Sequence, residues 1–176
     1  MKLNRTVALV GMMGAGKSSV GRRLAARLNV AFRDADAEIE SAAGCTISEI
    51  FERFGESAFR DGERKVIARL LSETPHVMAT GGGAFVDVDT REKLKQRAVT
   101  VWLKPPIDLL LARTQRRDTR PLLRQGDPRA ILERLLKERT PIYAEAQFTI
   151  DSEDGPHTAA VERIVAMLIA NGACEP

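Results

Sequence analysis

Eight residues near the start of the chain have the types and spacing of a phosphate-binding loop. Gly11–Ser18 reads GMMGAGKS, which fits the pattern G-x-x-x-x-G-K-[ST] without a mismatch. Glycines let successive backbone N–H groups turn toward a phosphate, and the start of the following helix adds partial positive charge. Lys17 is expected to reach the outer phosphates, and the Ser18 hydroxyl is expected to ligate Mg²⁺. The residues expected to bind a nucleotide such as ATP are Gly14, Ala15, Gly16, Lys17, Ser18 and Ser19.

Three further groups of residues have the chemistry to hold a ligand. Asp34 and Asp36 follow a weak strand signal, although Asp is also common where a helix begins. Arg60 lies three residues before Glu63, so the two form either a solvated pair on a helix or an arginine held in place by its partner. Gly81–Gly83 close another expected strand, and three glycines there suggest a close approach of the backbone to a ligand, although a plain loop has the same composition. The residue types alone leave these alternatives open.

Arginine dominates the basic residues of the chain. Of the 27 Lys and Arg residues, 20 are Arg; with 24 acidic residues the net charge is +3 and the sequence pI is about 9.1. So weak a basic balance does not by itself indicate nucleic-acid binding. The arginine-rich stretch over residues 113–124 contains no aromatic residue on which a base could stack, so we expect no nucleic-acid partner. Arginine suits bidentate contacts with carboxylate and phosphate, although genomic composition bias explains many of these residues equally well.

The elements that must position these residues alternate between strand and helix. Apolar runs predict strands at Thr6–Val10, His76–Thr80, Ala98–Leu103 and Phe148–Ile150, and a weak one at Ala31–Phe32 that leads into Asp34. Apolar periodicity predicts helices over Lys17–Leu28, in pieces over 37–73 with breaks at Gly44 and Gly55, from Ile107, over Pro128–Ala146 and over Ala159–Ala170. Ser48 with Glu52 is a candidate start for the second of those pieces, although this spacing misses a capping box by one residue. The alternation predicts an α/β fold with a parallel sheet.

Composition and length narrow the class of protein. The chain has 176 residues, 44% hydrophobic and 29% charged, which is typical of one globular domain. Val7–Val10 is too short and too soon broken by glycine to be a signal peptide, and no apolar run reaches the length of a membrane helix. Cys45 and Cys174 have no metal-ligand spacing and are expected to be unreactive thiols. We therefore expect a cytoplasmic protein that does not bind a membrane.

Five motifs in register resemble the shikimate kinase family of small P-loop kinases, which are related to nucleoside monophosphate kinases. They follow the phosphate loop as FRDAD (Phe32–Asp36), GCTISEIF (Gly44–Phe51), TGGG (Thr80–Gly83), RPLL (Arg120–Leu123) and ERTPIY (Glu138–Tyr143). The resemblance covers about residues 5 to 150. It implies a three-layer P-loop kinase fold with a five-stranded parallel sheet of order 2-3-1-4-5. It also implies one domain over 1–176, with a substrate-binding segment at about 33–62 and a lid at about 115–127.

The resemblance further implies a role for each residue that matches the family's motifs. The reaction is the ATP-dependent phosphorylation of the 3-hydroxyl of shikimate, in chorismate and aromatic amino-acid synthesis, with Mg²⁺ as cofactor. Lys17, Asp36 and Arg120 are the implied catalytic residues: Asp36 holds the acceptor hydroxyls and Arg120 is the lid arginine over the phosphates. Arg60 and Arg139 clamp the shikimate carboxylate, and Gly82 contacts the substrate through its backbone. Asp34 acts on the metal through water, and Arg113 packs on adenine.

Two alternatives and one departure remain at this point. A related kinase of the gluconate type would share the phosphate loop, and a P-loop protein that regulates a partner without turnover would share its nucleotide binding. The segment Ser152–His157 is acidic where the family often has a polar or basic adenine-contacting loop, so the adenine contact there is left unassigned. We expect a monomer whose partners are its two small-molecule substrates.

Overall fold

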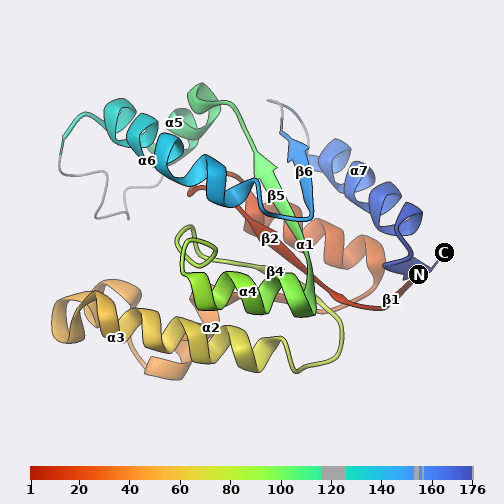
Figure 1. The fold of residues 1–176 in the computed structure, drawn as a ribbon, viewed down its shortest axis with the longest axis horizontal. Coiled ribbons are helices and arrows are strands. Elements are labelled where there is room, and N and C mark those ends of the chain that lie inside the picture. The colour runs from red at the N-terminus through yellow and green to blue at the C-terminus, as the bar shows by residue number, and fades with distance from the viewer. Residues whose placement is uncertain (116–125, 153–154, 156, 176) are drawn as a thin grey trace.

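A parallel sheet of five strands forms the centre of the fold (Figure 1). The computed structural model describes residues 1–115, 126–152, 155 and 157–175. The strands are β2 (Thr6–Val10), β3 (Phe32–Asp34), β4 (Val77–Ala79), β5 (Ala98–Lys104) and β6 (Phe148–Asp151). They are all parallel and lie in the order β3-β4-β2-β5-β6. Counted along the chain, this is the order 2-3-1-4-5 that the family resemblance implies, so that expectation is confirmed.

Helices cover the sheet and extend beyond the carboxyl ends of its strands. They are α1 (Lys17–Leu28), α2 (Ala35–Ala43), α3 (Ile47–Leu70), α4 (Val88–Arg97), α5 (Ile107–Gln115), α6 (Pro128–Tyr143) and α7 (His157–Ala170). Helix α1 packs on α7, and α3 packs on both α2 and α4. Helices α2 and α3 lie on one side of the carboxyl edge of the sheet, and α5 and α6 lie on the other (Figure 1). Residues from these two helical groups can therefore reach a ligand between them.

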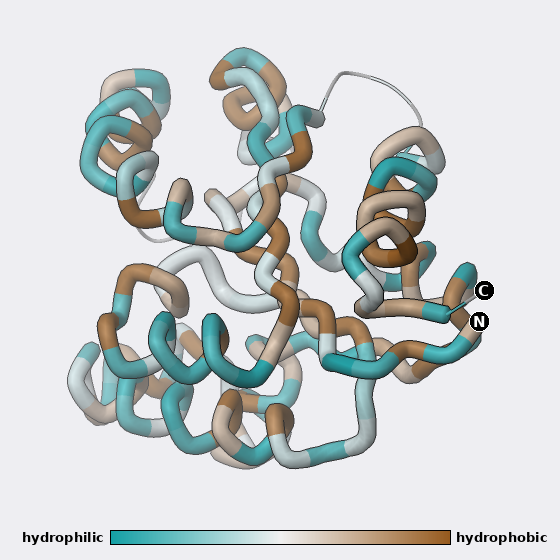
Figure 2. Tube along the Cα trace, turned by 45° about the vertical axis from the view of Figure 1, so that its right-hand side comes forward, coloured by the Kyte–Doolittle hydropathy of each residue, from teal (hydrophilic) through white to brown (hydrophobic). Residues whose placement is uncertain are grey.

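The inner strands β4, β2 and β5 are buried on both faces, whereas the edge strands β3 and β6 are partly exposed. All five residues of β2 are buried, as are the first six of β5. Continuous apolar runs of this kind are typical of parallel strands covered by helices on both sides. The apolar centre and the hydrophilic outer helix surfaces are visible in Figure 2. This buried sheet supplies the rigid base from which the functional loops extend.

The glycine breaks expected in the region 37–73 are confirmed. Gly44 ends α2 in the left-handed conformation, with φ 69°. Gly55 has φ 80° and ψ 174° inside α3 and kinks that helix. The candidate cap at Ser48 and Glu52 is wrong: Thr46 and Glu49 form the capping box that starts α3. Thr46 Oγ1 accepts from Glu49 N at 3.2 Å, and Glu49 Oε2 accepts from Thr46 N at 2.7 Å, which satisfies two N–H groups at once.

Three short elements have no counterpart in the sequence-based prediction. Helix α4 begins at its N-cap Asp87, whose side chain accepts from Thr90 N at 2.9 Å. Its apolar stripe is too sparse to predict a helix, because Leu94 is its only buried apolar residue. Strands β1 (Lys2–Leu3) and β7 (Cys174–Glu175) pair antiparallel near the two chain ends. Two-residue strands carry no periodicity, so only the folded chain reveals them.

The described part of the chain contains no helix that is long and apolar enough to cross a membrane. Cys45 and Cys174 are both free thiols. Of the lid expected over 115–127, residues 116–125 lie outside the described residues, and Arg120 is among them.

Candidate active site

The phosphate-binding loop follows β2 directly and is shaped by three glycines. Gly11, Gly14 and Gly16 have φ values of 136°, 78° and 89°, which side-chain-bearing residues rarely adopt. Gly16 is also the N-cap of α1, and no side chain caps that helix. The first N–H groups of α1 therefore face the loop together with the positive end of the helix dipole, an arrangement that attracts an anion such as phosphate.

Lys17 lies across this loop. Its Nζ donates to Gly11 O at 2.7 Å and to Met12 O at 2.8 Å, and the residue is only 8% exposed. The ammonium group is thus held at the centre of the loop by two backbone carbonyls. From this position a short movement of the Lys17 side chain would bring Nζ to a phosphate bound by the loop.

Asp34 joins the phosphate loop to α2. Ser18 Oγ donates to Asp34 Oδ2 at 2.6 Å, while Asp34 Oδ1 accepts from Asp36 N at 3.2 Å and Ala37 N at 3.5 Å. Asp34 therefore caps α2 and also contacts the loop. A hydroxyl and a carboxylate oxygen side by side are donors that suit Mg²⁺, which takes its other ligands from phosphate and water.

Gly81, Gly82 and Gly83 lie where side chains from two helices meet the carboxyl end of β4. All three have ordinary φ values, so at Gly81 and Gly83 space rather than backbone conformation requires glycine. A Cβ on Gly81 would lie 2.7 Å from Asp36 Oδ1, and one on Gly83 would lie 2.5 Å from Arg60 Nη2. A Cβ on Gly82 would lie 3.4 Å from Met13 N in the phosphate loop. The glycine turn thus brings Asp36, Arg60 and the phosphate loop to one place.

Arg60 is held by a buried carboxylate. Its Nη1 donates to Glu63 Oε1 at 2.6 Å, and the Glu63 side chain is 2% exposed. Burial raises the pKa of the Glu63 carboxyl, and the Arg60 charge partly offsets this effect; nearby Asp36 raises the pKa further. A solvated surface pair is therefore excluded, because Glu63 lies inside the protein. Glu63 fixes the arginine that faces the glycine turn.

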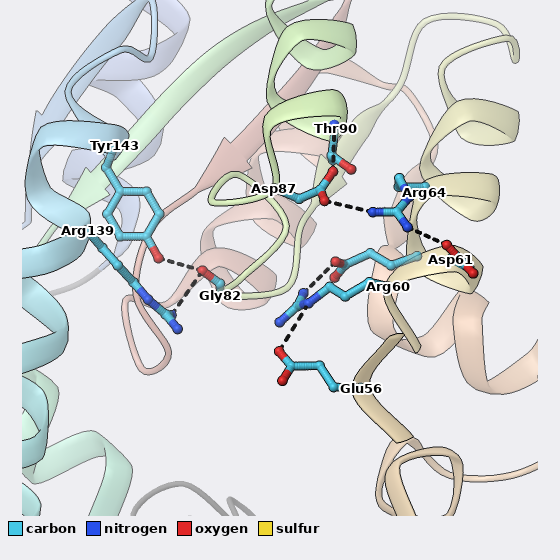
Figure 3. A network of polar contacts seen from close by, with 10 residues as sticks. Glu56, Arg60, Asp61, Arg64, Gly82, Asp87, Thr90, Arg139 and Tyr143 are labelled. Carbon is cyan, nitrogen blue, oxygen red and sulfur yellow. Dashed lines mark hydrogen bonds and ion pairs between the residues drawn. The ribbon is translucent and has the colours of Figure 1, made fainter. Parts of the chain in front are cut away.

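Arg139 reaches the same turn from α6. Its Nη1 donates to Gly82 O at 3.4 Å, and Tyr143 Oη donates to the same carbonyl at 2.5 Å. Figure 3 shows Arg139 and Arg60 approaching Gly82 from opposite sides, one from α6 and the other from α3. Burial raises the pKa of the Tyr143 hydroxyl, and the positive charges of Arg139 and Arg60 partly offset this effect. Two guanidinium groups beside one glycine turn have the chemistry to bind a carboxylate, because the planar fork pairs with both carboxylate oxygens.

A second network of ion pairs lies next to this turn and connects α3 with the start of α4. Arg64 Nη1 donates to Asp87 Oδ2 at 2.8 Å, and Arg64 also pairs with Asp61 (Figure 3). Burial raises the pKa of Asp87, but the hydrogen bonds from Thr90 and Arg64 outweigh it and lower the pKa overall. Asp87 therefore remains ionised as the cap of α4 and as the partner of Arg64. This ion pair links α3 to the end of the loop that begins at Gly81.

On the other side of the phosphate loop, Arg113 and His157 meet at Gly16. A Cβ on Gly16 would lie 3.4 Å from both Arg113 Nη1 and His157 Cε1. Arg113 Nη1 also donates to Gly14 O and Ala15 O, each at 3.5 Å. His157 belongs to the segment whose adenine contact was left unassigned; residues 153, 154 and 156 of it lie outside the described part. Burial lowers the pKa of His157, as do the charges of Arg113 and Arg23.

The remaining expected nucleotide contact is Ser19, in the first turn of α1. Its carbonyl accepts from Arg23 Nη1 at 3.0 Å. Among the described residues, the structure thus brings Lys17, Ser18, Asp34, Asp36, Arg60, Gly82 and Arg139 around one edge of the sheet. Sequence reasoning did not single out His157 as a site residue or Tyr143 as a partner of Gly82. An isolated His or Tyr carries no spacing signal, although Tyr143 belonged to a motif of the resemblance.

Comparisons with known proteins agree with this geometry. Residues 13–169 match the family model described as shikimate kinase. A protein named shikimate kinase from Paramagnetospirillum magneticum is 59% identical over 168 residues, covering 96% of this chain and 86% of that protein. The solved structure of shikimate kinase from Acinetobacter baumannii in complex with shikimate has a TM-score of 0.91 and 44% identity, covering 95% of this chain and 94% of the other. A gluconokinase from Sinorhizobium meliloti is 17% identical with a TM-score of 0.58, covering 97% of this chain and 99% of that one, and shares the fold alone.

Proposed function

Because the chain belongs to the shikimate kinase family, we propose that it transfers the γ-phosphoryl group of ATP to the 3-hydroxyl of shikimate. The product is shikimate 3-phosphate, an intermediate of chorismate and aromatic amino-acid synthesis. The observation that carries the choice of acceptor is the position of Arg60 and Arg139 on either side of the glycine turn, next to the phosphate loop. A hydroxy acid fits there with its carboxylate on the arginines and its hydroxyl toward the phosphate.

The phosphate loop would bind the transferring group. Backbone N–H groups of residues 14–19 would surround the phosphates, and Lys17 Nζ would leave the carbonyls of Gly11 and Met12 for the outer phosphate oxygens. Ser18 would ligate Mg²⁺ directly and Asp34 would act through water, because their oxygens already lie together. The ion, when bound, neutralises charge on the phosphate oxygens. Arg113 would pack on the adenine, and Arg120 would reach over the phosphates.

Asp36 would align the acceptor. Its carboxylate lies beside Gly81, the first residue of the turn whose next two residues meet the phosphate loop and the two arginines. Phosphoryl transfer needs little covalent chemistry from the protein, so catalysis depends on in-line alignment and on stabilising negative charge. Asp36 would accept a hydrogen bond from the reacting hydroxyl and take its proton as the O–P bond forms. Arg60 and Arg139 would set the distance between this hydroxyl and the γ-phosphate by holding the carboxylate end.

A coupled assay of ADP release tests the proposal. ATP turnover should depend on shikimate, and ³¹P NMR of the product should show a phosphate ester at the 3-position. Gluconate at the same concentration should not support turnover. Lys17→Ala should lose at least about a hundredfold in turnover, since a charge that stabilises the transition state is removed. Turnover without dependence on shikimate, or an equal rate with gluconate, would refute the choice of acceptor.

The same experiment tests the alternative function, a P-loop protein that binds nucleotide and regulates a partner without turnover. It requires that the purified protein binds ATP and releases no ADP with any acceptor. Asp36 beside the glycine turn, at the same edge of the sheet as the phosphate loop, favours catalysis, because a regulator needs no acceptor base. We further propose that the protein acts on its two small-molecule substrates as a monomeric domain over 1–176, with a substrate-binding segment at about 33–62 and a lid at about 115–127.

A further inference from the structure

Tyr143 is a buried side chain that contacts two parts of the active site and the core of the sheet. The residue has no exposed surface, and its hydroxyl donates to Gly82 O at 2.5 Å. The hydroxyl also lies 3.9 Å from Met12 Sδ in the phosphate loop. The ring packs on Trp102 of β5, with 5.8 Å between the ring centroids. Burial raises the pKa of the Tyr143 phenol, so the hydroxyl remains protonated and available as a donor at neutral pH.

The hydrogen bond from Tyr143 to Gly82 O fixes the orientation of the peptide group between Gly82 and Gly83. The peptide between Gly82 and Gly83 is trans, so its C=O and its N–H point in opposite directions. Because Gly82 O accepts from Tyr143 and Arg139 on α6, the Gly83 N–H faces away from α6. The Arg60 guanidinium lies against Gly83 on the side of α3. Figure 3 shows Gly82 between Arg139 and Arg60, and the peptide that joins it to Gly83 therefore links the contacts of the two arginines.

Because Gly82 and Gly83 are both glycines, the peptide between them can rotate unless a hydrogen bond holds its carbonyl. Residues without a Cβ have more accessible backbone conformations than any other, so two consecutive glycines form a weakly constrained unit. Arg139 alone holds Gly82 O at the long distance of 3.4 Å, whereas Tyr143 holds it at 2.5 Å. Tyr143 lies one helical turn after Arg139 on the same helix, so both donors come from one rigid element.

We propose that Tyr143 is a positioning residue for the acceptor: its hydroxyl fixes the Gly82–Gly83 peptide so that the turn and Arg139 meet the substrate in one arrangement. This inference rests on the proposed function, since it concerns the acceptor of that reaction. Tyr143 itself does not touch the substrate. It acts through Gly82 O, and we expect its effect on the acceptor to exceed its effect on ATP, because its 2.5 Å hydrogen bond to Gly82 O is much shorter than its 3.9 Å contact with Met12 Sδ in the phosphate loop.

Steady-state kinetics of Tyr143→Phe test the proposal. The variant keeps the ring on Trp102 and removes only the hydroxyl. The KM for shikimate should rise about tenfold, in the range of one buried hydrogen bond, while the KM for ATP should stay within about twofold. Ile164→Val, which removes one methyl group from the core on α7, is the control and should change neither KM. An unchanged KM for shikimate in Tyr143→Phe, or an equal rise in both KM values, would overturn the proposal.

A second measurement keeps the test decisive if Tyr143→Phe does not fold. Tyr143 is the only tyrosine in the sequence, so 3-fluorotyrosine supplied during expression labels this position alone. Shikimate should shift the ¹⁹F resonance of the active wild-type protein, and ADP should leave it in place. A resonance that shifts with ADP and not with shikimate, or with neither, would overturn the proposal. If the wild-type protein does not turn over shikimate at all, the proposed function fails first, and this inference fails with it.

Discussion

Arg60 and Arg139 contact consecutive residues of the glycine turn: Arg139 Nη1 donates to Gly82 O, and the Arg60 guanidinium lies against Gly83. The two arginines come from helices on opposite sides of the sheet edge, α3 and α6. Their spacing is therefore set by one peptide unit rather than by the packing of one helix on another. A single carboxylate beside this peptide can pair with both.

The paired arginines predict a loss of shikimate binding when either is changed. Arg60→Lys keeps the charge and loses the planar fork, so it should weaken binding of shikimate and leave binding of ATP unchanged. Arg139→Ala should cost about 1.5–3 kcal/mol of shikimate binding, because a charged partner is lost. The two changes should be non-additive, since they share one ligand group. Calorimetric titration of the single and double variants measures this; small additive losses, or losses confined to ATP, would contradict the shared carboxylate.

Asp36→Asn should reduce turnover strongly and leave ATP affinity roughly unchanged. The amide still contacts the hydroxyl but cannot accept its proton, so alignment persists and proton transfer fails. General-base catalysis contributes about 10²- to 10⁴-fold, which sets the expected decrease in kcat. Single-turnover kinetics together with a nucleotide titration measure the two effects separately. Wild-type turnover in this variant would remove Asp36 from the proposed role.

Gly83→Ala should act on Arg60 through space. The new Cβ would lie 2.5 Å from Arg60 Nη2 and 2.9 Å from Nη1, so the guanidinium must move. We expect a higher KM for shikimate with a small change in melting temperature, because a flexible side chain can yield where the backbone cannot. Gly62→Ala on α3 is the matched control: nothing lies within 4 Å of its Cβ, and helix propensity should stabilise the fold by up to about 1 kcal/mol. Equal KM values for both variants would show that Gly83 does not position Arg60.

His157 predicts a pH dependence of stability. Burial and the charges of Arg113 and Arg23 lower its pKa in the folded protein below the ordinary value of 6.5. The folded state thus favours the neutral imidazole, so this contribution to stability is complete above pH 6.5 and is lost as the pH falls from there through the folded pKa. Urea unfolding of the wild-type protein and of His157→Gln measures this pH-dependent contribution. The two pH values are 7.5 and 5.5, about one unit on either side of 6.5. The stability of the wild-type protein relative to the variant should decrease at the lower pH; a constant difference would contradict the assignment.

Much of the fold was predictable because its elements carry strong local signals. The strand Thr6–Val10 and the helix Lys17–Leu28 were predicted with their observed bounds, because the loop of glycines marks the boundary between them. Helix α4 was missed for the opposite reason: it holds one buried apolar residue, and its start depends on the Asp87 side chain. The cap of α3 was misplaced because several hydroxyl and acidic residues lie close together, and only the backbone shows which pair is in register.

The site divides in a similar way. Residues in motifs with fixed spacing, such as Lys17 and Ser18, were predictable from the sequence together with their chemistry. Glu63 could not be assigned, because its role depends on burial and the same i, i+3 spacing also occurs on solvated helices. His157 and the bond from Tyr143 to Gly82 escaped prediction, since they depend on contacts between segments far apart in the chain.

The pairing of β1 with β7 joins the beginning of the described chain to its end. Leu3 and Cys174 are buried partners in this ladder, and Asn4 N donates to Ala173 O at 3.0 Å. During synthesis residues 2–3 leave the ribosome long before residues 174–175, so β1 must wait until the intervening residues 4–173 are made before it finds its partner. The same adjacency means that a short peptide linker could close the backbone into a ring, and new ends opened elsewhere would leave the five-stranded sheet connected.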